Sequence, residues 1–341
     1  MTTPLPTFCP KKNCPCFQLN NKKITRDGTY PVDLSDERRQ MFYCHGGKHR
    51  FSEMTYSELI NKKGSEKEYI QTAKLIKYGL SCEQIADVLG RDVRTIENWV
   101  KAIAEKSDRF HNFICVFLGI TIEFLQMDEL WSYLKNKKRQ LWIFIALESQ
   151  SKFWINFELG SRTNWTANRL VKGLKGLARW DCGVLLKVTT DKLAAYKNAL
   201  SKQFYSINYV YLQIVKKRVK RRLKTVKKCF VKGSERDFPS GTQNTSYLER
   251  FNLTLRQRVS YLHRKTIGYC KNKTNFSRTL WINLFDYNYC QFHKSLRLDL
   301  TGEKTKFKKR YKQVTPAMKM GLTTSQLDWR FLLVSPVPKN D

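Results

Sequence analysis

The sequence predicts an α/β fold, a mixed sheet with flanking helices, that follows two smaller N-terminal segments. Three observations carry this prediction. From about residue 120 onwards, apolar strand patterns are interspersed with helix patterns. Residues 61–108 show only helical periodicity, and residues 1–60 combine cysteine with lysine, glycine and proline. A chain of 341 residues is long enough for two or three such parts.

The composition excludes a globally disordered chain and points to a polyanionic partner. Hydrophobic residues make up 41% of the chain, enough for a real core, and the formal net charge is +34. Nucleic acid is the expected partner, and an anionic membrane surface is the weaker alternative. The longest apolar stretch, Phe113 to Ile122, is too short to cross a bilayer. Because the N-terminus lacks the apolar core of a signal peptide, we expect an intracellular, DNA-associated protein with reduced or metal-bound cysteines.

The strand and helix patterns of the third part, residues 109–341, follow a recognisable order. Strands are expected at 122–130, 141–147, 152–159, 184–189 and 209–215, and helices at 165–178 and 193–200. Three strands, a helix, a strand and a helix form the order of an RNase H-like mixed sheet. In such a sheet, acidic residues at strand ends gather at one edge.

Three acidic residues are the candidates for that edge. Asp128 ends the first strand and Asp191 follows the fourth. Residues 244–266 read as one helix, in which Glu249 lies beside an apolar stripe. The apolar stripe of this helix comprises Leu248, Phe251, Leu255, Val259 and Leu262. Glu249, Arg256 and His263 are seven residues apart, so they are expected to share one face beside that stripe. Simpler interpretations remain: Glu129 is a rival to Asp128, Asp191 begins a helix, and Glu249 completes a capping box with Ser246.

Three carboxylates at one edge would suit a divalent-metal site. Two Mg²⁺ (or Mn²⁺) ions can activate a water or hydroxyl and stabilise the leaving oxygen when a phosphodiester is broken. Carboxylate oxygens are the hard ligands that such ions prefer. In this hypothesis Asp128 bridges both ions, and Asp191 and Glu249 each favour one. Arg256, His263 and Lys265 would contact DNA.

The cysteine-rich segment, residues 1–60, is expected to form a zinc-ribbon-like domain. Two ligand pairs on a hairpin can hold a tetrahedral Zn²⁺ in a domain too small for a core of its own. The expected ligands are Cys9, Cys14 or Cys16, Cys44, and His49 or His45. The alternative is a set of free thiols in a flexible tail.

Residues 61–108 are expected to form a DNA-binding helix-turn-helix. A first helix stops at Gly79, a second begins at Ser81 with a Ser81–Gln84 capping box, and Gly90 makes the turn. A third helix starts near Asp92. Its outward positions suit phosphates and base edges in the major groove. These positions are Arg91, Arg94, Thr95, Asn98 and Lys101. The alternative is a helical hairpin that only packs.

A dense basic run, KKRVKRRLKTVKK, occupies residues 216–228 within an insertion near 214–240. It reads either as a solvated loop or as a DNA-contacting insertion, and we favour the second because so dense a charge binds phosphate. The expected contacts are Lys216, Lys217, Arg218, Lys220, Arg221 and Arg222.

Six segments carry a resemblance to a known family: MDELWSY, KKRQLWIFIAL, VTTDKLAAY, NTSYLERFNLTLRQRVSYLHRKT, YNYCQFHKSLR and TPAMKMGLT. Together they resemble, from about residue 120 to 325, the transposases of the insertion-sequence-one family of mobile elements. The resemblance implies a DDE active site at Asp128, Asp191 and Glu249, and a divalent metal. It also implies binding to the terminal inverted repeats of an element, with DNA cleavage and strand transfer.

Two features depart from the family pattern. Lys192 follows Asp191 where many relatives have a small residue, and the gap from Asp191 to Glu249 is long. Because transposases must pair two ends, we expect a homo-oligomer on double-stranded DNA. The alternatives are a non-catalytic, transposase-derived regulator and a structure-selective RNase H-like nuclease.

Overall fold

The computed structural model describes residues 6, 9–11, 13–17, 23–32, 38–56, 64–180, 183–219, 222–263, 269–299, 311–335 and 337. The chain packs into two compact units. One unit comprises residues 1–76, 80–110 and 327–341, and the other comprises residues 77–79 and 111–326. The division of the chain into three domains stays a prediction.

A small antiparallel sheet begins the first unit. It contains β1 (Ile24–Pro31), β2 (Arg38–Cys44) and β3 (His49–Ser52) in that order, and η1 (Glu53–Tyr56) follows. Among the described residues, its hydrophobic cluster consists of three non-cysteine residues, Ile24, Phe42 and Phe51, together with four cysteines. So few apolar side chains give a core too small to stabilise the segment by burial alone.

Three helices follow: α1 (Glu66–Lys77), α2 (Cys82–Leu89) and α3 (Val93–Leu118). The predicted capping box begins α2, because Ser81 N–H donates to Gln84 Oε1 at 2.9 Å and Gln84 N–H donates to Ser81 Oγ at 3.3 Å. Gly90 ends α2 with a φ of 61°, a left-handed conformation that glycine adopts easily. Tyr69 packs on Trp99 at 4.4 Å between ring centroids, which joins α1 to α3.

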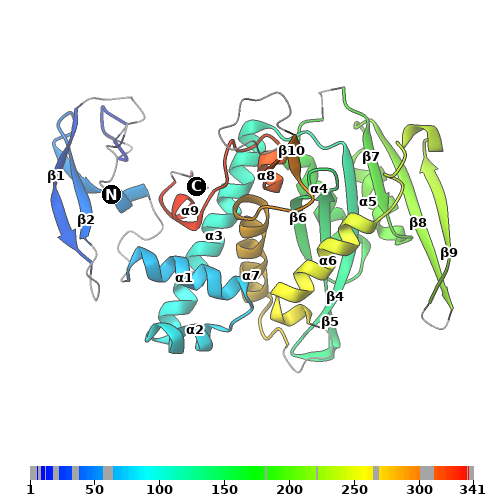
Figure 1. The fold of residues 1–341 in the computed structure, drawn as a ribbon, viewed down its shortest axis with the longest axis horizontal. Helices are drawn as coiled ribbons and strands as arrows, with labels where there is room; N and C mark the ends of the chain where they lie inside the picture. Colours follow the sequence, from blue (N-terminus) through cyan, green and yellow to red (C-terminus); the bar gives the residue numbers. More distant parts are fainter. Residues whose placement is uncertain are drawn as a thin grey trace. The chain divides into compact units, whose positions relative to one another are not determined.

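The second unit is built on a six-stranded mixed sheet with flanking helices (Figure 1). Its strands are β4 (Phe124–Leu134), β5 (Asn136–Glu148), β6 (Phe153–Gly160), β7 (Leu186–Thr190), β8 (Tyr209–Val219) and β9 (Arg222–Lys232). The strand order is β6-β5-β4-β7-β8-β9. β7 is parallel to both β4 and β8, and the other pairs are antiparallel. The mixed α/β part of the predicted fold class is therefore confirmed.

The two faces of the sheet are covered by different helices (Figure 1). On β5, Ile143 and Ile145 point into a core shared with α6 (Ser246–Arg258) and α7 (Lys273–Phe285). Phe144 points to the opposite face, where it packs edge-on against Tyr196 of α5 (Ala194–Gln203). The helix α4 (Asn164–Leu177) packs against α5 and covers β5 and β6.

The helix that carries Glu249 is shorter than predicted. It ends at Arg258, and Val259 takes an extended conformation before the 3₁₀ turn η3 (Ser260–Leu262). The expectation that His263 shares a helical face with Glu249 and Arg256 is therefore wrong. The apolar spacing was misleading because Val259 and Leu262 still reach the same core after the chain has left the helix.

The described residues of the basic run, 216–219 and 222–228, lie in strands. β9 pairs with β8, and β7 pairs with β8 only as far as Gln213. From Ile214 onwards the two strands therefore form a two-stranded ribbon that extends past the neighbouring strand (Figure 1). β9 was missed because its lysines leave no apolar pattern for a strand.

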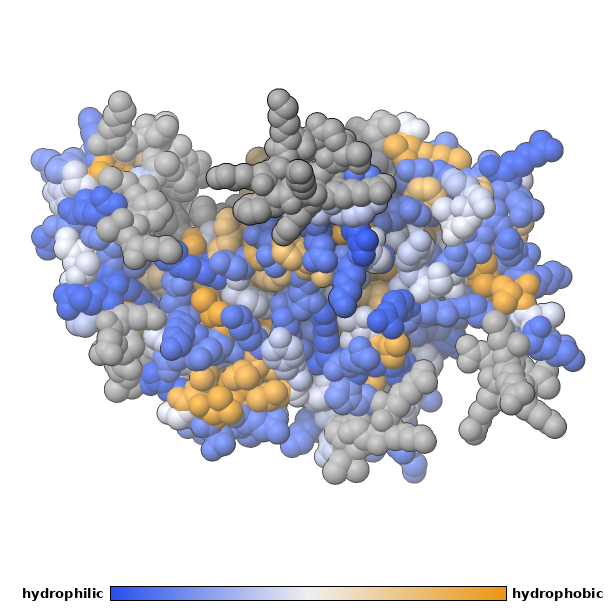
Figure 2. All heavy atoms as spheres, in the orientation of Figure 1, coloured by the Kyte–Doolittle hydropathy of each residue, from blue (hydrophilic) through white to orange (hydrophobic). Residues whose placement is uncertain are grey.

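The remaining described elements are short. They are η2 (Glu235–Asp237), the π-helical turn η4 (Asp286–Cys290), β10 (Arg297–Asp299), β11 (Tyr311–Gln313), α8 (Pro316–Lys319) and α9 (Trp329–Val334). Within the described residues, no helix has the length and apolar character needed to span a membrane. The face in view in Figure 2 is mostly hydrophilic, as expected for the high content of charged residues.

Candidate active site and metal centres

Three carboxylates meet where β4 and β7 run side by side. Met127 of β4 pairs with Thr190 of β7 in parallel register, so the residues that follow them, Asp128 and Asp191, are neighbours. Carboxylate oxygens of Asp128, Glu129 and Asp191 all lie within 4.8 Å of one another. The gathering of the two aspartates agrees with the expectation from the strand order, and Glu129 joins them.

The crowding of these acids changes their protonation. Burial, together with the negative charges of Glu129 and Asp191, raises the pKa of Asp128 to about 7. Burial and Asp191 also raise the pKa of Glu129, and the guanidinium of Arg162 partly opposes this. Carboxylates that resist ionisation for these reasons favour a bound cation, so the donor set fits a divalent metal ion.

Glu129 has protein partners for both of its oxygens. Arg162 Nε donates to Oε1 at 2.8 Å, and the Tyr196 hydroxyl donates to Oε2 at 3.3 Å. Arg162 also approaches Asp191, with 3.9 Å between Nη2 and Oδ2. Sequence reasoning missed Arg162, which lies between β6 and α4, because no local pattern marks its approach to the acids.

Glu249 lies on the first turn of α6 and faces the same cleft. The cleft has a volume of about 550 Å³ and is lined by Asp128, Glu129, Leu130, Glu249, Asn252, Leu253, Arg256 and Gln257. Glu249 contacts the ammonium of Lys216 on β8 and accepts a hydrogen bond from the Thr245 hydroxyl at 2.8 Å. It is not among the grouped carboxylates of the described residues.

Direct hydrogen bonds fasten α6 to β4. Asn252 Nδ2 donates to Asp128 Oδ2 at 2.8 Å, and Leu248 N–H donates to Gln126 Oε1 at 3.0 Å. Gln126 Nε2 also donates to the Asn244 carbonyl at 2.8 Å. Sequence reasoning missed Asn252, although its position three residues after Glu249 puts both side chains on one side of a helix.

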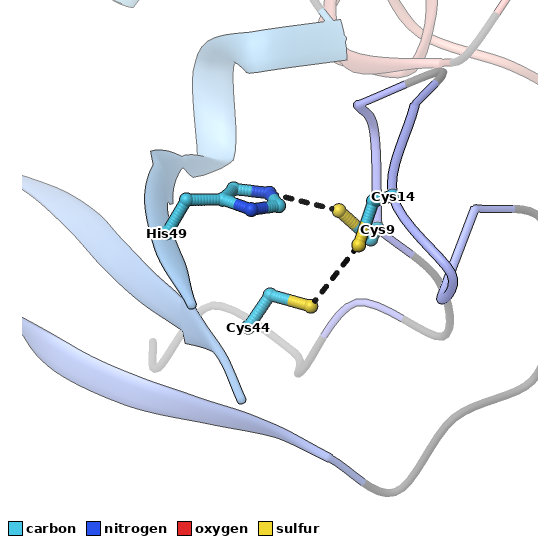
Figure 3. Close-up of side chains that lie close together, drawn as sticks. All are labelled: Cys9, Cys14, Cys44 and His49. Atoms are coloured by element: carbon cyan, nitrogen blue, oxygen red, sulfur yellow. Dashed lines mark hydrogen bonds between the residues drawn. The ribbon is translucent and has the colours of Figure 1, made fainter. Parts of the chain in front are cut away.

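A second group of candidate metal ligands lies in the small N-terminal sheet (Figure 3). Ligand atoms of Cys9, Cys14, Cys44 and His49 lie within 4.8 Å of one another. Cys9 Sγ is 3.1 Å from His49 Nε2, and Cys14 Sγ is 3.7 Å from Cys44 Sγ. Zn–S bonds of about 2.3 Å in a tetrahedron place two sulfurs about 3.8 Å apart, so the spacing fits zinc.

The two alternatives left open in this segment lie beside the group. The Cys16 thiol lies against Gly46, where a Cβ atom would come within 2.1 Å of its sulfur. His45 Nε2 is 3.0 Å from Thr25 Oγ1. A Cβ atom on Gly47 would meet Cys14 Sγ at 2.5 Å and the His49 ring at 2.7 Å. Only glycine therefore fits at residue 47 without moving two of the grouped side chains.

The predicted DNA-reading positions of the third helix differ in exposure. Arg94, Asn98 and Lys101 are exposed, and Thr95 is half-buried. The Arg91 side chain is not turned outward as expected, because its Nε donates to Glu68 at 2.7 Å and only 15% of the side chain is exposed. Burial by itself would raise the pKa of Glu68, but the hydrogen bonds from Arg91 and Ser65 lower this pKa below its usual value, so the carboxylate stays ionised beside the guanidinium.

The other predicted DNA contacts are spread around the cleft and the ribbon. Lys216 reaches Glu249, Lys217 is exposed, and Arg256 lines the cleft while donating to the Leu262 carbonyl at 3.2 Å. His263 is exposed beyond the end of α6. Lys220, Arg221 and Lys265 lie outside the described residues, as do the side chains of Arg218 and Arg222.

The fold and the acids first define a class of protein: a mixed α/β domain in which aspartates lie side by side where the pairing of two parallel strands ends, next to a carboxylate-lined cleft. Comparison with known proteins shows which family within this class the chain resembles. Residues 121–237 match the family model described as IS1 transposase. The predicted resemblance to the insertion-sequence-one transposases is therefore confirmed. The matched segment includes Asp128 and Asp191 and ends before Glu249.

Individual relatives agree with the family match. The chain is 27% identical over 147 residues to the insertion element IS1 protein InsB of Shigella sonnei, covering 43% of this chain and 82% of the relative. The same identity over the same length relates it to the IS1 9 protein InsB of Escherichia coli K12, of which the match covers 65%. Among solved structures, a piggyBac transposase synaptic complex with hairpin DNA has a TM-score of 0.32 at 14% identity, covering 66% of each chain.

Proposed function

We propose that the protein is a transposase that binds the terminal inverted repeats of a mobile element and catalyses metal-dependent cleavage and strand transfer of DNA. One observation carries the proposal: Asp128, within β4, and Asp191, directly after β7, lie side by side inside the segment that matches the IS1 family model. The strand order, three antiparallel strands followed by two parallel to the first, supports an RNase H-like sheet with one added strand.

Asp128, Asp191 and Glu249 would hold two Mg²⁺ or Mn²⁺ ions. When bound, such ions supply Lewis-acid stabilisation of the phosphodiester oxygens and a more acidic water. Asp128 lies beside Asp191 and would hold metal together with it. We favour Glu249 as the third ligand because both oxygens of Glu129 already accept hydrogen bonds. Lys216 and Thr245 both donate to the same oxygen of Glu249, Oε1, and the Glu249 side chain is 49% exposed on the cleft.

The protein's own side chains would position the DNA. Arg256 lines the cleft and would neutralise a phosphate next to the scissile bond. Asn252 would keep Asp128 oriented through its hydrogen bond. The exposed lysines of the β8–β9 ribbon, including Lys217, would contact phosphates farther along the duplex.

The first unit would recognise the element ends. Cys9, Cys14, Cys44 and His49 would hold one structural Zn²⁺, whose binding stabilises a sheet with few apolar side chains of its own. The helices α1 to α3 would act as a helix-turn-helix, with Arg94, Asn98 and Lys101 reading the major groove. A DNA-associated homo-oligomer follows from the need to pair two ends.

Cleavage of end DNA tests the proposal. The substrate is labelled duplex from the inverted repeats that flank the protein's own gene, with Mg²⁺ or Mn²⁺. Wild type should cut at the element boundary, and Asp128→Asn and Asp191→Asn should bind the duplex but not cut it. If all three proteins bind and none cuts, the protein is a DNA-binding regulator. Cutting at branched structures irrespective of sequence would instead indicate a structure-selective nuclease.

A further inference from the structure

Three aromatic side chains, of which Trp131 is exposed and Tyr133 and Trp142 are half-buried, gather on one face of the β4–β5 hairpin, beyond the acids. Trp131 and Tyr133 alternate with the buried residues Leu130 and Ser132, so both rings lie on the same face. Trp142 is paired directly opposite Trp131 and adds a third ring to that face. The Trp131 and Tyr133 ring centroids are 5.5 Å apart, and 38% of Trp131 is exposed. We call Trp131, Tyr133 and Trp142 the aromatic platform.

The aromatic platform adjoins the candidate active site. Glu129 lies two residues before Trp131 on the same face of β4. Its partner Arg162 lies over the Trp142 ring, 5.0 Å from the centroid. With a rise of about 3.3 Å per residue, Trp131 is about 10 Å along the strand from Asp128, a distance of only a few nucleotides.

Exposed positive charges border the platform. Lys137, Lys138 and Arg139 are exposed at the end of the same hairpin, and 43% of the Arg162 side chain is exposed. Aromatic rings beside cations are the combination that binds unpaired nucleic acid, because bases stack on the rings while phosphates meet the cations. The bases of an intact duplex already stack on each other and do not offer their faces.

A second copy of this chain fits the aromatic platform less well than nucleic acid does. The chain carries a formal net charge of +34, so a partner copy would bring more positive charge to a surface already bordered by lysine and arginine. A strand of unpaired DNA instead brings one negative charge with each base. Charge complementarity therefore favours the nucleic acid.

We propose that the aromatic platform binds unpaired nucleobases of the DNA strand next to the cleavage position, by stacking on Trp131 and Trp142. This inference rests on the proposed function, since it places a DNA strand at the Asp128–Asp191 cluster. It adds the prediction that the duplex is opened locally at the element boundary. Such strands come from the donor flank or from target DNA, and both present the same chemistry.

Binding of forked DNA tests the platform without requiring catalysis. Two labelled duplexes of the same end sequence are compared by fluorescence anisotropy in Ca²⁺: one fully paired, and one with six unpaired nucleotides on the flank side. A third probe carries the unpaired nucleotides in an unrelated target sequence, which separates the donor and target sources. Wild type should bind at least one forked probe about tenfold more tightly than its paired counterpart, as expected for stacking of one or two bases.

Variants assign that preference to the rings. Trp131→Ala should remove the preference for the fork and leave binding of paired DNA unchanged. Trp131→Leu keeps an apolar side chain without a stacking ring and should behave in the same way, whereas Trp131→Phe should retain the preference. Trp165→Ala removes a tryptophan that is 61% exposed on α4, and it serves as the matched control.

The possible results separate the two proposals. If wild type shows no preference for forked DNA, or if Trp131→Leu keeps the preference, the proposal that the platform stacks unpaired bases is contradicted, whether or not the protein cuts DNA. A Trp131-dependent fork preference in a protein that never cuts would leave the platform standing and contradict the transposase. If Trp131→Ala instead dissociates an oligomer and leaves fork binding intact, the face is a protein interface and the proposal fails.

Discussion

Asn252 of α6 donates a hydrogen bond of 2.8 Å to the carboxylate of Asp128 on β4. The donor is 7% exposed, so this bond is shielded from water. It fixes the orientation of the central acid, and it holds the helix that carries Glu249 against the sheet. The position of the third acid therefore depends on a residue that is not itself a candidate metal ligand.

Removal of this hydrogen bond should slow cleavage. Hydrogen bonds to charged groups contribute about 1.5–3 kcal/mol, so we expect Asn252→Ala to lower the rate of strand cleavage by about 10- to 100-fold. Binding of end DNA should stay close to wild type. Thr254→Ala, two residues later on the same helix, is the matched control. Equal cleavage by Asn252→Ala and Thr254→Ala would show that Asn252 does not orient Asp128.

The carboxylate cluster predicts a pH dependence of stability. Burial and the neighbouring acids raise the pKa of Asp128 to about 7, above its unfolded value near 4. Because the folded state favours the neutral carboxyl, stability should fall as the pH rises from about 4 to about 7 and then level off. In metal-free buffer, thermal unfolding should show a decline of a few degrees over this range. Asp128→Asn should flatten that decline and Mg²⁺ should reverse it, whereas a wild-type slope in the variant would contradict the assignment.

Lys216 should compete with metal for Glu249. Its ammonium contacts the Glu249 carboxylate and lies near Asp128, so it occupies a position where a cation is needed. We expect Lys216→Met to lower the Mg²⁺ concentration for half-maximal cleavage several-fold. Lys217→Met, on the opposite face of the ribbon, should not change it. A higher Mg²⁺ requirement in Lys216→Met would show that the lysine assists the site instead.

The N-terminal cluster predicts one zinc ion per chain. Purified protein should contain about one equivalent of zinc by elemental analysis, and Cys44→Ser should lose it because the ligand set is incomplete. Gly47→Ala should release zinc to a chelator faster than wild type, since the added Cβ meets Cys14 and His49. Cys229→Ser, an exposed thiol on β9, is the control. Full zinc content in Cys44→Ser would contradict the site.

Apolar patterns made most of the second unit predictable. Residues 141–147 read as a buried strand because both faces of β5 are covered, and β4, β6 and β7 lie within a few residues of their predicted positions. Asp191 was found because it directly follows a strand, whereas the prediction that Asp128 ends its strand is wrong, since β4 continues to Leu134. Apolar patterns did not predict where the helix α6 ends. The Val259 side chain stays in the core, as a helical pattern would require, although the helix ends before this residue.

Residue pairs that are distant in sequence could not be predicted. The contact of Arg162 with Glu129 joins a loop to a strand, and no periodicity signals it. In the same way, sequence spacing left Cys14 and Cys16 as equal zinc ligands, and only the folded hairpin places Cys14 in the group. The charged strand β9 could not be predicted from its own sequence either, because it is extended through its pairing with β8.

Strand transfer is the reaction that separates a transposase from a nuclease and from a DNA-binding regulator. End DNA that already carries a free 3′-hydroxyl is incubated with target DNA and Mg²⁺, and joined product is measured for wild type, Glu249→Gln and Glu129→Gln. We predict joined product from wild type, none from Glu249→Gln, and residual product from Glu129→Gln, with all three proteins bound to the end. If wild type cuts DNA but never joins the pre-cleaved end, or if Glu249→Gln joins as well as wild type, the proposed transposase with its third acid at Glu249 is contradicted.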